Sequence, residues 1–241
     1  MMNKKKSIFI IALIIMIAIT SPIVSWSIGS ELKESPIKVE STTESKPEST
    51  IEPETETPVA DDDFVNIRSI DSSIIVDLVY NTPNNFTHQR IYDFAQGVLR
   101  HSTAKKLAAA NSILKDHGFV IKVWDAYRPL YAQQALWDAY PDVNFVAKPD
   151  PNHIAGHQLG ATVDMTLCTL DGKEALMQTP FDDFSSKAFR NYPRTEEQEK
   201  NYQIMDDAMV QSGFIGYELE WWEYRDSNQN FPPIEIDPSK V

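Results

Sequence analysis

Hydrophobic and polar positions repeat along this chain with two different periods, and each period predicts a different kind of element. Residues 102–118 carry apolar side chains at the spacing of one helix face, begin with a capping serine or threonine and end on Gly118. They predict an amphipathic helix. A second helix is expected over 130–139. A third is expected over 196–212, with Gly213 as its stop.

Four stretches rich in β-branched and aromatic residues predict strands. They are 73–80, 119–124, 161–167 and a final stretch over 214–224, which we expect to form the last strand. A hairpin turn is expected at 170–173, directly after the third of these strands.

Polar stretches between these elements predict loops. One covers 81–87, with Phe86 as its apolar anchor, and a second covers 141–154. The stretch 178–184 is expected to be a loop that can line a pocket. The polar, proline-rich tail after Asp226 is expected to lie over the surface.

The N-terminal region differs from the rest of the chain in composition. Lysines 4–6 precede an apolar run that reaches Trp26, and this predicts a signal peptide or N-terminal membrane anchor over residues 1–29. Residues 30–63 hold eleven acidic residues and three lysines without an aromatic residue, and they predict a disordered acidic linker. The remaining residues, 64–241, are long enough for one domain. Because the lysines should stay inside, we expect this domain to be extracytoplasmic, either secreted or membrane-anchored and associated with the cell wall.

The net charge of the chain bears on its binding partners, and its cysteine content bears on how the fold is stabilised. The formal net charge is −13, which argues against nucleic acid as a partner. Cys168 is the single cysteine, so no intramolecular disulfide can form. Stability must therefore come from packing or from a bound metal.

The stretch 152–170 contains the strongest candidates for metal ligands. His157 lies on an expected turn, and Asp164 follows within the expected strand, so the two can converge on one ion. His153 is the alternative candidate for the histidine ligand. A carboxylate inside a strand needs a partner if it is buried, and a metal is one that suffices.

Arg128 precedes a proline at the expected end of a strand. It can form a structural ion pair, or it can direct its guanidinium into a cleft to hold a carboxylate or a developing oxyanion. Spacing alone does not choose between these two roles.

Two glutamates flank a pair of tryptophans in the last expected strand. The tryptophans favour a covered strand, so Glu220 or Glu223 needs a partner. The two-residue period of a strand places these glutamates on opposite faces. Both can reach one site only if the strand bends or ends near Trp222.

Three separated motifs together resemble the zinc D-alanyl-D-alanine dipeptidases, relatives of the VanX vancomycin-resistance enzymes. Shorter segments at 85–87, 179–182 and 213–214 are also similar to that family. The resemblance covers most of the domain and implies an α+β fold of the zinc D,D-peptidase type, with a small, mainly antiparallel sheet flanked by helices. The three motifs are WDAYRP at 124–129, His157-x-x-Gly160-x-x-x-Asp164 and Glu220-Trp221-Trp222.

The same resemblance implies roles for individual residues. His157 and Asp164 match metal ligands, and the third ligand position falls on Glu223. Glu220 matches the general base, and Arg128 matches the arginine that stabilises the transition state. The implied cofactor is Zn²⁺, with Mn²⁺ as an alternative for a carboxylate-rich ligand set.

The implied substrate is D-Ala-D-Ala or a D-Ala-terminated peptidoglycan stem peptide. The substrate-binding candidates are Asn85, Phe86, Tyr127 and Trp222.

This chain departs from the family pattern at three positions. Glu223 stands where the family has histidine, Ala155 where it usually has serine, and Thr162 where it usually has alanine. A carboxylate can bind zinc, but a second negative ligand should raise the pKa of bound water. Three interpretations therefore remain open: a metal-dependent hydrolase, a catalytically impaired relative that binds D-Ala-terminated stem peptides, and a protein with a purely structural role.

Overall fold

The computed structural model describes residues 58–150, 154 and 156–241. The expected signal or anchor segment and most of the expected linker lie outside the described residues, as do His153 and Ala155. No helix in the described part of the chain has the length and apolar character needed to cross a membrane.

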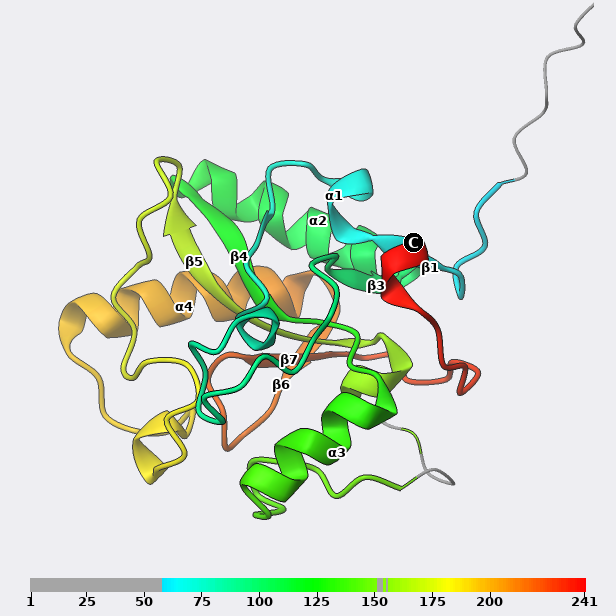
Figure 1. Cartoon of the computed structure of the whole chain (residues 1–241). Coiled ribbons are helices and arrows are strands. Elements are labelled where there is room, and N and C mark those ends of the chain that lie inside the picture. Colours follow the sequence, from blue (N-terminus) through cyan, green and yellow to red (C-terminus); the bar gives the residue numbers. More distant parts are fainter. Residues whose placement is uncertain (1–57, 151–153, 155) are drawn as a thin grey trace, which may run out of the picture. The chain divides into compact units, whose positions relative to one another are not determined.

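A five-stranded sheet forms the centre of the fold (Figure 1). The outer strand β2 pairs parallel with β4, and every other pairing in this sheet is antiparallel. The expected α+β fold with a mainly antiparallel sheet is therefore confirmed. In spatial order the strands are β2 (Ile75–Val76), β4 (Phe119–Asp125), β5 (Thr162–Thr169), β7 (Glu223–Asp226) and β6 (Phe214–Gly216).

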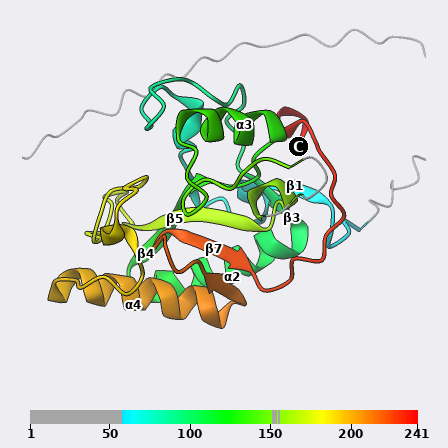
Figure 2. The same ribbon diagram turned by 90° about the horizontal axis from the view of Figure 1, so that it is seen from below.

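Helices cover both faces of the sheet. The long helices α2 (His101–Asp116) and α4 (Glu196–Gln211) lie together on one face, and α3 (Leu130–Ala139) lies on the other (Figure 2). All three match the helices expected from the sequence. A capping box at Thr195 begins α4, and Gly213, at φ +91°, ends it in the left-handed region that favours glycine.

A second, two-stranded sheet lies beside α2 and was not expected from the sequence. It pairs β1 (Phe64–Asn66) with β3 (Val98–Arg100), and the short helix α1 (Ile67–Ile70) follows β1. Just before β1, the carbonyl of Asp61 accepts from the backbone N–H of Ser102 at 3.0 Å. The last residues of the expected linker therefore contact the folded domain.

Two strand predictions were wrong in extent. The expected strand at 73–80 keeps only two strand residues, because the chain then turns into the 3₁₀ helix η1 (Val79–Asn81). The Tyr80 carbonyl accepts hydrogen bonds from the backbone N–H groups of Ile91 and Tyr92. It therefore binds a loop segment and does not pair with a neighbouring strand. The final stretch at 214–224 forms two strands, β6 and β7, joined by a turn at 217–222.

The two adjacent tryptophans anchor that turn in the core. Trp221 and Trp222 are 0 and 1% exposed, as their size predicted. The indole N–H of Trp221 donates to Thr179 Oγ1 at 2.8 Å, and its ring packs edge to face on Trp124 at 5.9 Å. Burial of about 200 Å² of each indole stabilises the fold by several kcal/mol, at about 25 cal/mol per Å².

Candidate metal centre

His157 lies on a 3₁₀ turn, η2 (Gly156–Leu159), that leads into β5. Gly160 ends the turn at φ +71°, and a Cβ there would lie 2.4 Å from the ring of Phe64. His157 Nδ1 is 2.7 Å from the Ala126 carbonyl oxygen, so Nδ1 must carry the proton and donate it. This hydrogen bond leaves the Nε2 lone pair for a metal.

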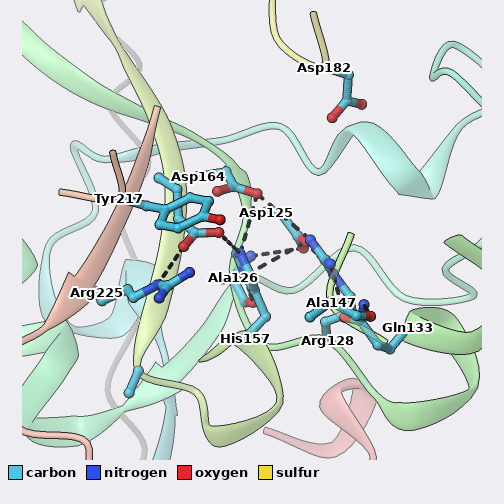
Figure 3. Close-up of polar contacts among 12 residues, drawn as sticks. Asp125, Ala126, Arg128, Gln133, Ala147, His157, Asp164, Asp182, Tyr217 and Arg225 are labelled. Atoms are coloured by element: carbon cyan, nitrogen blue, oxygen red, sulfur yellow. Dashed lines mark hydrogen bonds and ion pairs between the residues drawn. The ribbon is translucent and has the colours of Figure 1, made fainter. Parts of the chain in front are cut away.

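Strand register brings three carboxylates to the same level of the sheet. Asp164 of β5 lies opposite Glu223 of β7, and on its other side it lies opposite Asp125 at the end of β4. Directly opposed residues place their side chains on the same face. His157 Nε2 is 3.4 Å from Asp164 Oδ2 (Figure 3). The same nitrogen is 3.6 Å from Glu223 Oε2.

The atoms at this point fit a divalent metal ion. Around a tetrahedral zinc ion, bonds of about 2.0–2.1 Å place neighbouring ligand atoms about 3.3 Å apart, close to the separations observed here. In the part of the chain that the structure describes, His157 Nε2 and Asp164 Oδ1 are buried without a hydrogen-bond partner. Unpaired buried polar atoms are costly, and a bound cation would satisfy both.

Asp125 supports this centre and does not supply a ligand. Its Oδ2 accepts from Arg128 Nε and Nη2 at 2.9 and 2.6 Å. Its Oδ1 accepts from the Tyr92 hydroxyl at 2.7 Å and from the Ala126 backbone N–H at 2.9 Å. Both carboxylate oxygens are therefore used by hydrogen-bond donors.

The electrostatics of the metal-free centre favour a proton where a cation would bind. Burial and the charge of Arg128 lower the pKa of His157, but the carboxylates of Asp164 and Glu223 beside its ring outweigh them and raise this pKa to about 10. Burial raises the pKa of Glu223, but His157 and Arg225 outweigh it and lower the pKa to about 2. Burial raises the pKa of Asp164, and His157 opposes that shift.

Arg128 is buried at the corner after β4, as the sequence predicted for its position. Besides the double contact with Asp125, its Nη1 donates to Gln133 Oε1 of α3 at 3.0 Å. Gln133 is fixed in turn by donation to the Ala147 carbonyl at 2.6 Å. Arg128 Nη2 lies 3.7 Å from Asp164 Oδ2, so the guanidinium is an oriented cation at the edge of the centre.

Glu220 lies in the turn before β7 and is 4% exposed. Because the turn precedes the strand, Glu220 and Glu223 reach one site without sharing a strand face. One oxygen of each of these two glutamates and of Asp164 lies within 4.8 Å of the others. Burial, followed by repulsion from Glu223 and Asp164, holds the pKa of Glu220 well above its usual range.

One partly buried arginine binds carbonyl oxygens of the turn at 217–222 and of the first residue of β7. Arg190 donates to the carbonyls of Tyr217, Trp221 and Glu223 at 2.8, 3.2 and 2.9 Å. Its own backbone N–H donates to the Glu218 carbonyl at 3.0 Å. The turn therefore places Glu220 and Glu223 through a fixed set of hydrogen bonds.

A cavity of about 780 Å³ opens over the centre. Among the substrate-binding candidates, only Trp222 lines it. Asn85 and Phe86 line a larger cavity of about 1330 Å³, and Asp182 borders both. Tyr127 lines neither cavity, because its ring packs on Phe64 and its hydroxyl accepts from the Ile236 backbone N–H. The smaller cavity is lined by the candidate metal ligands together with Glu220 and Arg128, so it is the candidate active site. Its polar lining includes Arg128, His157, Asp164, Asp182, Glu220, Glu223 and Arg225.

Three residues of this site were not singled out from the sequence. Asp125 belongs to the WDAYRP motif, and its position before Arg128 was an available signal. Arg225 follows Glu223 by two residues, which is the spacing of one strand face. Asp182 belongs to the segment 179–182 that is similar to the family and to the loop expected to line a pocket, and these were the available signals. It stands apart from the other labelled residues in Figure 3, and its oxygens accept from the Tyr80 hydroxyl at 3.0 and 3.2 Å.

A histidine and two carboxylates around one point, beside a buried glutamate and an oriented arginine, form the type of site that metal-dependent hydrolases use. The sequence model of a family described as D-ala-D-ala dipeptidase matches residues 60–237. The chain belongs to this family.

Individual relatives agree with this membership. The chain is 29% identical over 163 residues to a D-alanyl-D-alanine dipeptidase of Escherichia coli (strain K12), covering 67% of this chain and 83% of the relative. It is 28% identical over 196 residues to one of Enterococcus faecium, covering 72% of this chain and 96% of the relative. A solved structure of the vancomycin resistance D,D-pentapeptidase VanY with Zn(II) is 16% identical, with a TM-score of 0.38, and the match covers 57% of this chain and 76% of that one.

Proposed function

We propose that this protein is a zinc-dependent peptidase that hydrolyses D-Ala-D-Ala or D-Ala-terminated cell-wall peptides. The observation that carries the proposal is the convergence of His157, Asp164 and Glu223 beside Glu220 and Arg128 in one cavity. Membership of the D-ala-D-ala dipeptidase family supports this substrate class.

His157, Asp164 and Glu223 would hold the metal through one imidazole nitrogen and two carboxylates. Three protein ligands leave a position open for water, as catalytic zinc sites require. When bound, the metal supplies Lewis acidity toward a water molecule and the peptide carbonyl. Because two of the three ligands are carboxylates, Mn²⁺ is the second metal to test.

Glu220 would act as the general base. In the metal-free protein, burial and the neighbouring carboxylates hold the pKa of Glu220 well above its usual range. A cation bound beside it would favour the ionised carboxylate, which is the form that can accept a proton. Its carboxylate would accept a proton from the attacking water and then deliver this proton to the amine of the leaving D-alanine.

Arg128 would stabilise the negative charge that develops on the carbonyl oxygen. Its Nε and Nη2 are bound by Asp125 and its Nη1 by Gln133, so the guanidinium is oriented before substrate binds. A preorganised charge costs no reorganisation during the reaction, which is the main source of such stabilisation.

We propose an extracytoplasmic location, at the cell wall, for the catalytic domain. The basic and apolar N-terminal sequence and the acidic stretch that follows support this location, because they are typical of an export signal or anchor and a spacer. An enzyme placed there would meet peptidoglycan stem peptides directly.

The proposal is tested with the purified chain, supplied with Zn²⁺ or Mn²⁺, by measuring D-alanine release from D-Ala-D-Ala and from stem peptides. Glu220→Gln serves as the inactive reference. We expect release that depends on the metal and on Glu220. Absence of release with both metals and both substrates would contradict the enzyme, and saturable peptide binding in that case would favour the catalytically impaired relative.

A further inference from the structure

The unusual ligand candidate Glu223 has an arginine bonded to its carboxylate. Arg225, two residues further along β7, donates from Nε to Glu223 Oε1 at 2.6 Å. The other carboxylate oxygen, Oε2, is the one that faces His157 Nε2 at 3.6 Å. One carboxylate oxygen of Glu223 therefore accepts a hydrogen bond from the arginine, and the other faces the candidate metal centre.

Arg225 is itself held in place. Its guanidinium lies over the Tyr217 ring, with Cζ 4.3 Å from the ring centroid. Its backbone is paired on both sides, with Thr162 of β5 and with Ile215 of β6. The Tyr217 hydroxyl in turn donates to the Asn144 carbonyl at 3.0 Å. Contacts from three directions thus fix the arginine before any metal binds.

The charge of Arg225 matters because the centre is rich in carboxylates. His157, Asp164 and Glu223 together carry a formal charge of −2 when the histidine is neutral. Arg128, a buried arginine nearby, forms its salt bridge with Asp125, so its charge is already paired with a carboxylate outside the ligand set. Arg225 forms its salt bridge with Glu223 itself. The Glu223–Arg225 pair is neutral overall, as an imidazole ligand would be.

Solvent screening does not remove this effect. The Arg225 side chain is 44% exposed, and an exposed ion pair contributes little to folding stability. The Glu223 side chain, however, is only 10% exposed, so its orientation and charge act inside the cavity. The expected effect of Arg225 is therefore on the metal site and not on the stability of the fold.

We propose that Arg225 is a positioning residue that makes Glu223 an effective metal ligand. It binds Oε1, which leaves Oε2 for the ion, and it offsets the second negative charge of the ligand set. The inference rests on the proposed function in one respect: a divalent metal binds at His157, Asp164 and Glu223.

The test measures the Zn²⁺ affinity of the metal-free full chain by competition with a chromophoric chelator, which requires no turnover. Arg225→Ala should weaken Zn²⁺ binding about 10- to 100-fold, the range for residues that orient metal ligands. Arg225→Lys keeps the charge but loses the planar fork, so it should fall between the wild type and Arg225→Ala. Arg68→Ala, at an exposed arginine on α1, is the matched control and should bind as the wild type does.

A double-mutant cycle separates positioning from a general structural role. In a Glu223→His background there is no carboxylate to orient, so adding Arg225→Ala should change Zn²⁺ affinity by no more than about twofold, the usual error of additivity. Thermal unfolding of the metal-free Arg225→Ala protein should match that of the wild type.

Three results have distinct meanings. Equal Zn²⁺ affinity of the wild type and Arg225→Ala would overturn the inference. It would also be overturned if Arg225→Ala reduced Zn²⁺ affinity by the same factor in the wild-type and Glu223→His proteins. Failure of the wild-type chain to bind Zn²⁺ at all would instead contradict the metal centre on which the proposed function depends.

Discussion

Gly216 lies against the guanidinium of Arg190, and a Cβ at position 216 would stand 2.0 Å from Arg190 Cζ. Because the arginine can approach so closely, its single guanidinium donates hydrogen bonds to the carbonyls of Tyr217, Trp221 and Glu223. A glycine at the end of β6 therefore helps to determine where Glu220 and Glu223 lie.

Gly216→Ala should reduce both activity and stability. The added methyl must displace Arg190, and buried carbonyls left without a donor cost about 1–3 kcal/mol. A shift of about 1 Å in the turn that carries Glu220 can reduce kcat about 100-fold. Urea unfolding and steady-state kinetics measure the two effects.

Gly118→Ala is the matched control. Gly118 has φ +81°, but a Cβ there would meet nothing within 4 Å. Its substitution should cost about 1 kcal/mol of backbone strain and leave kcat unchanged. A Gly216→Ala protein with wild-type kcat would show that the Arg190 contacts do not position the site.

Glu220→Gln should remove the general base while preserving the shape of the site. We expect kcat to fall about 100- to 10,000-fold, the usual range for such groups, with metal stoichiometry unchanged. The exposed neighbour Glu218 provides the control Glu218→Gln, which should retain full activity. Loss of metal together with activity would instead make Glu220 a ligand.

Metal binding should release protons at neutral pH. In the metal-free protein the pKa of His157 is raised to about 10, above its ordinary value of 6.5, so the ring holds a proton that the metal must displace. Zn²⁺ affinity should therefore rise with pH, by up to about tenfold per pH unit for one proton, until the pH approaches 10.

Calorimetric titration at pH 7 in two buffers with different ionisation enthalpies measures the number of protons released. We expect at least one. The exposed His117 gives the control variant His117→Ala, which should release as many protons as the wild type. Binding without proton release would mean that His157 is neutral in the metal-free protein.

Asp182→Asn should weaken the binding of a free dipeptide more than that of a blocked one. Burial, followed by repulsion from Asp164, raises the pKa of Asp182 to about 8, and an arriving ammonium group would favour its ionised form. A charged hydrogen bond contributes about 1.5–3 kcal/mol, so KM for D-Ala-D-Ala should rise about tenfold or more.

N-acetyl-D-Ala-D-Ala, which lacks the ammonium group, provides the comparison for Asp182. Its KM should be nearly the same for the wild type and the variant, and Zn²⁺ affinity should not change. An equal rise in KM for both peptides would assign Asp182 to the general shape of the cavity.

The sequence by itself determined the long elements and pointed to the candidate site residues. The helices α2, α3 and α4 follow from apolar spacing and end signals within one segment, which are local properties. The motifs around Arg128, His157 and Asp164 indicated the family. The predicted burial of the tryptophan pair followed from side-chain size alone.

The tertiary structure alone decided how these groups meet. The sequence pattern for 214–224 predicted one strand, which would separate Glu220 and Glu223 on opposite faces. The observed turn depends on Arg190, which precedes α4 and reaches the turn only after the chain has folded. The alignment of Asp164 with Asp125 and with Glu223 likewise depends on strand register. Local sequence specifies which residues can bind and react, but contacts between distant segments determine which of their atoms are free to do so.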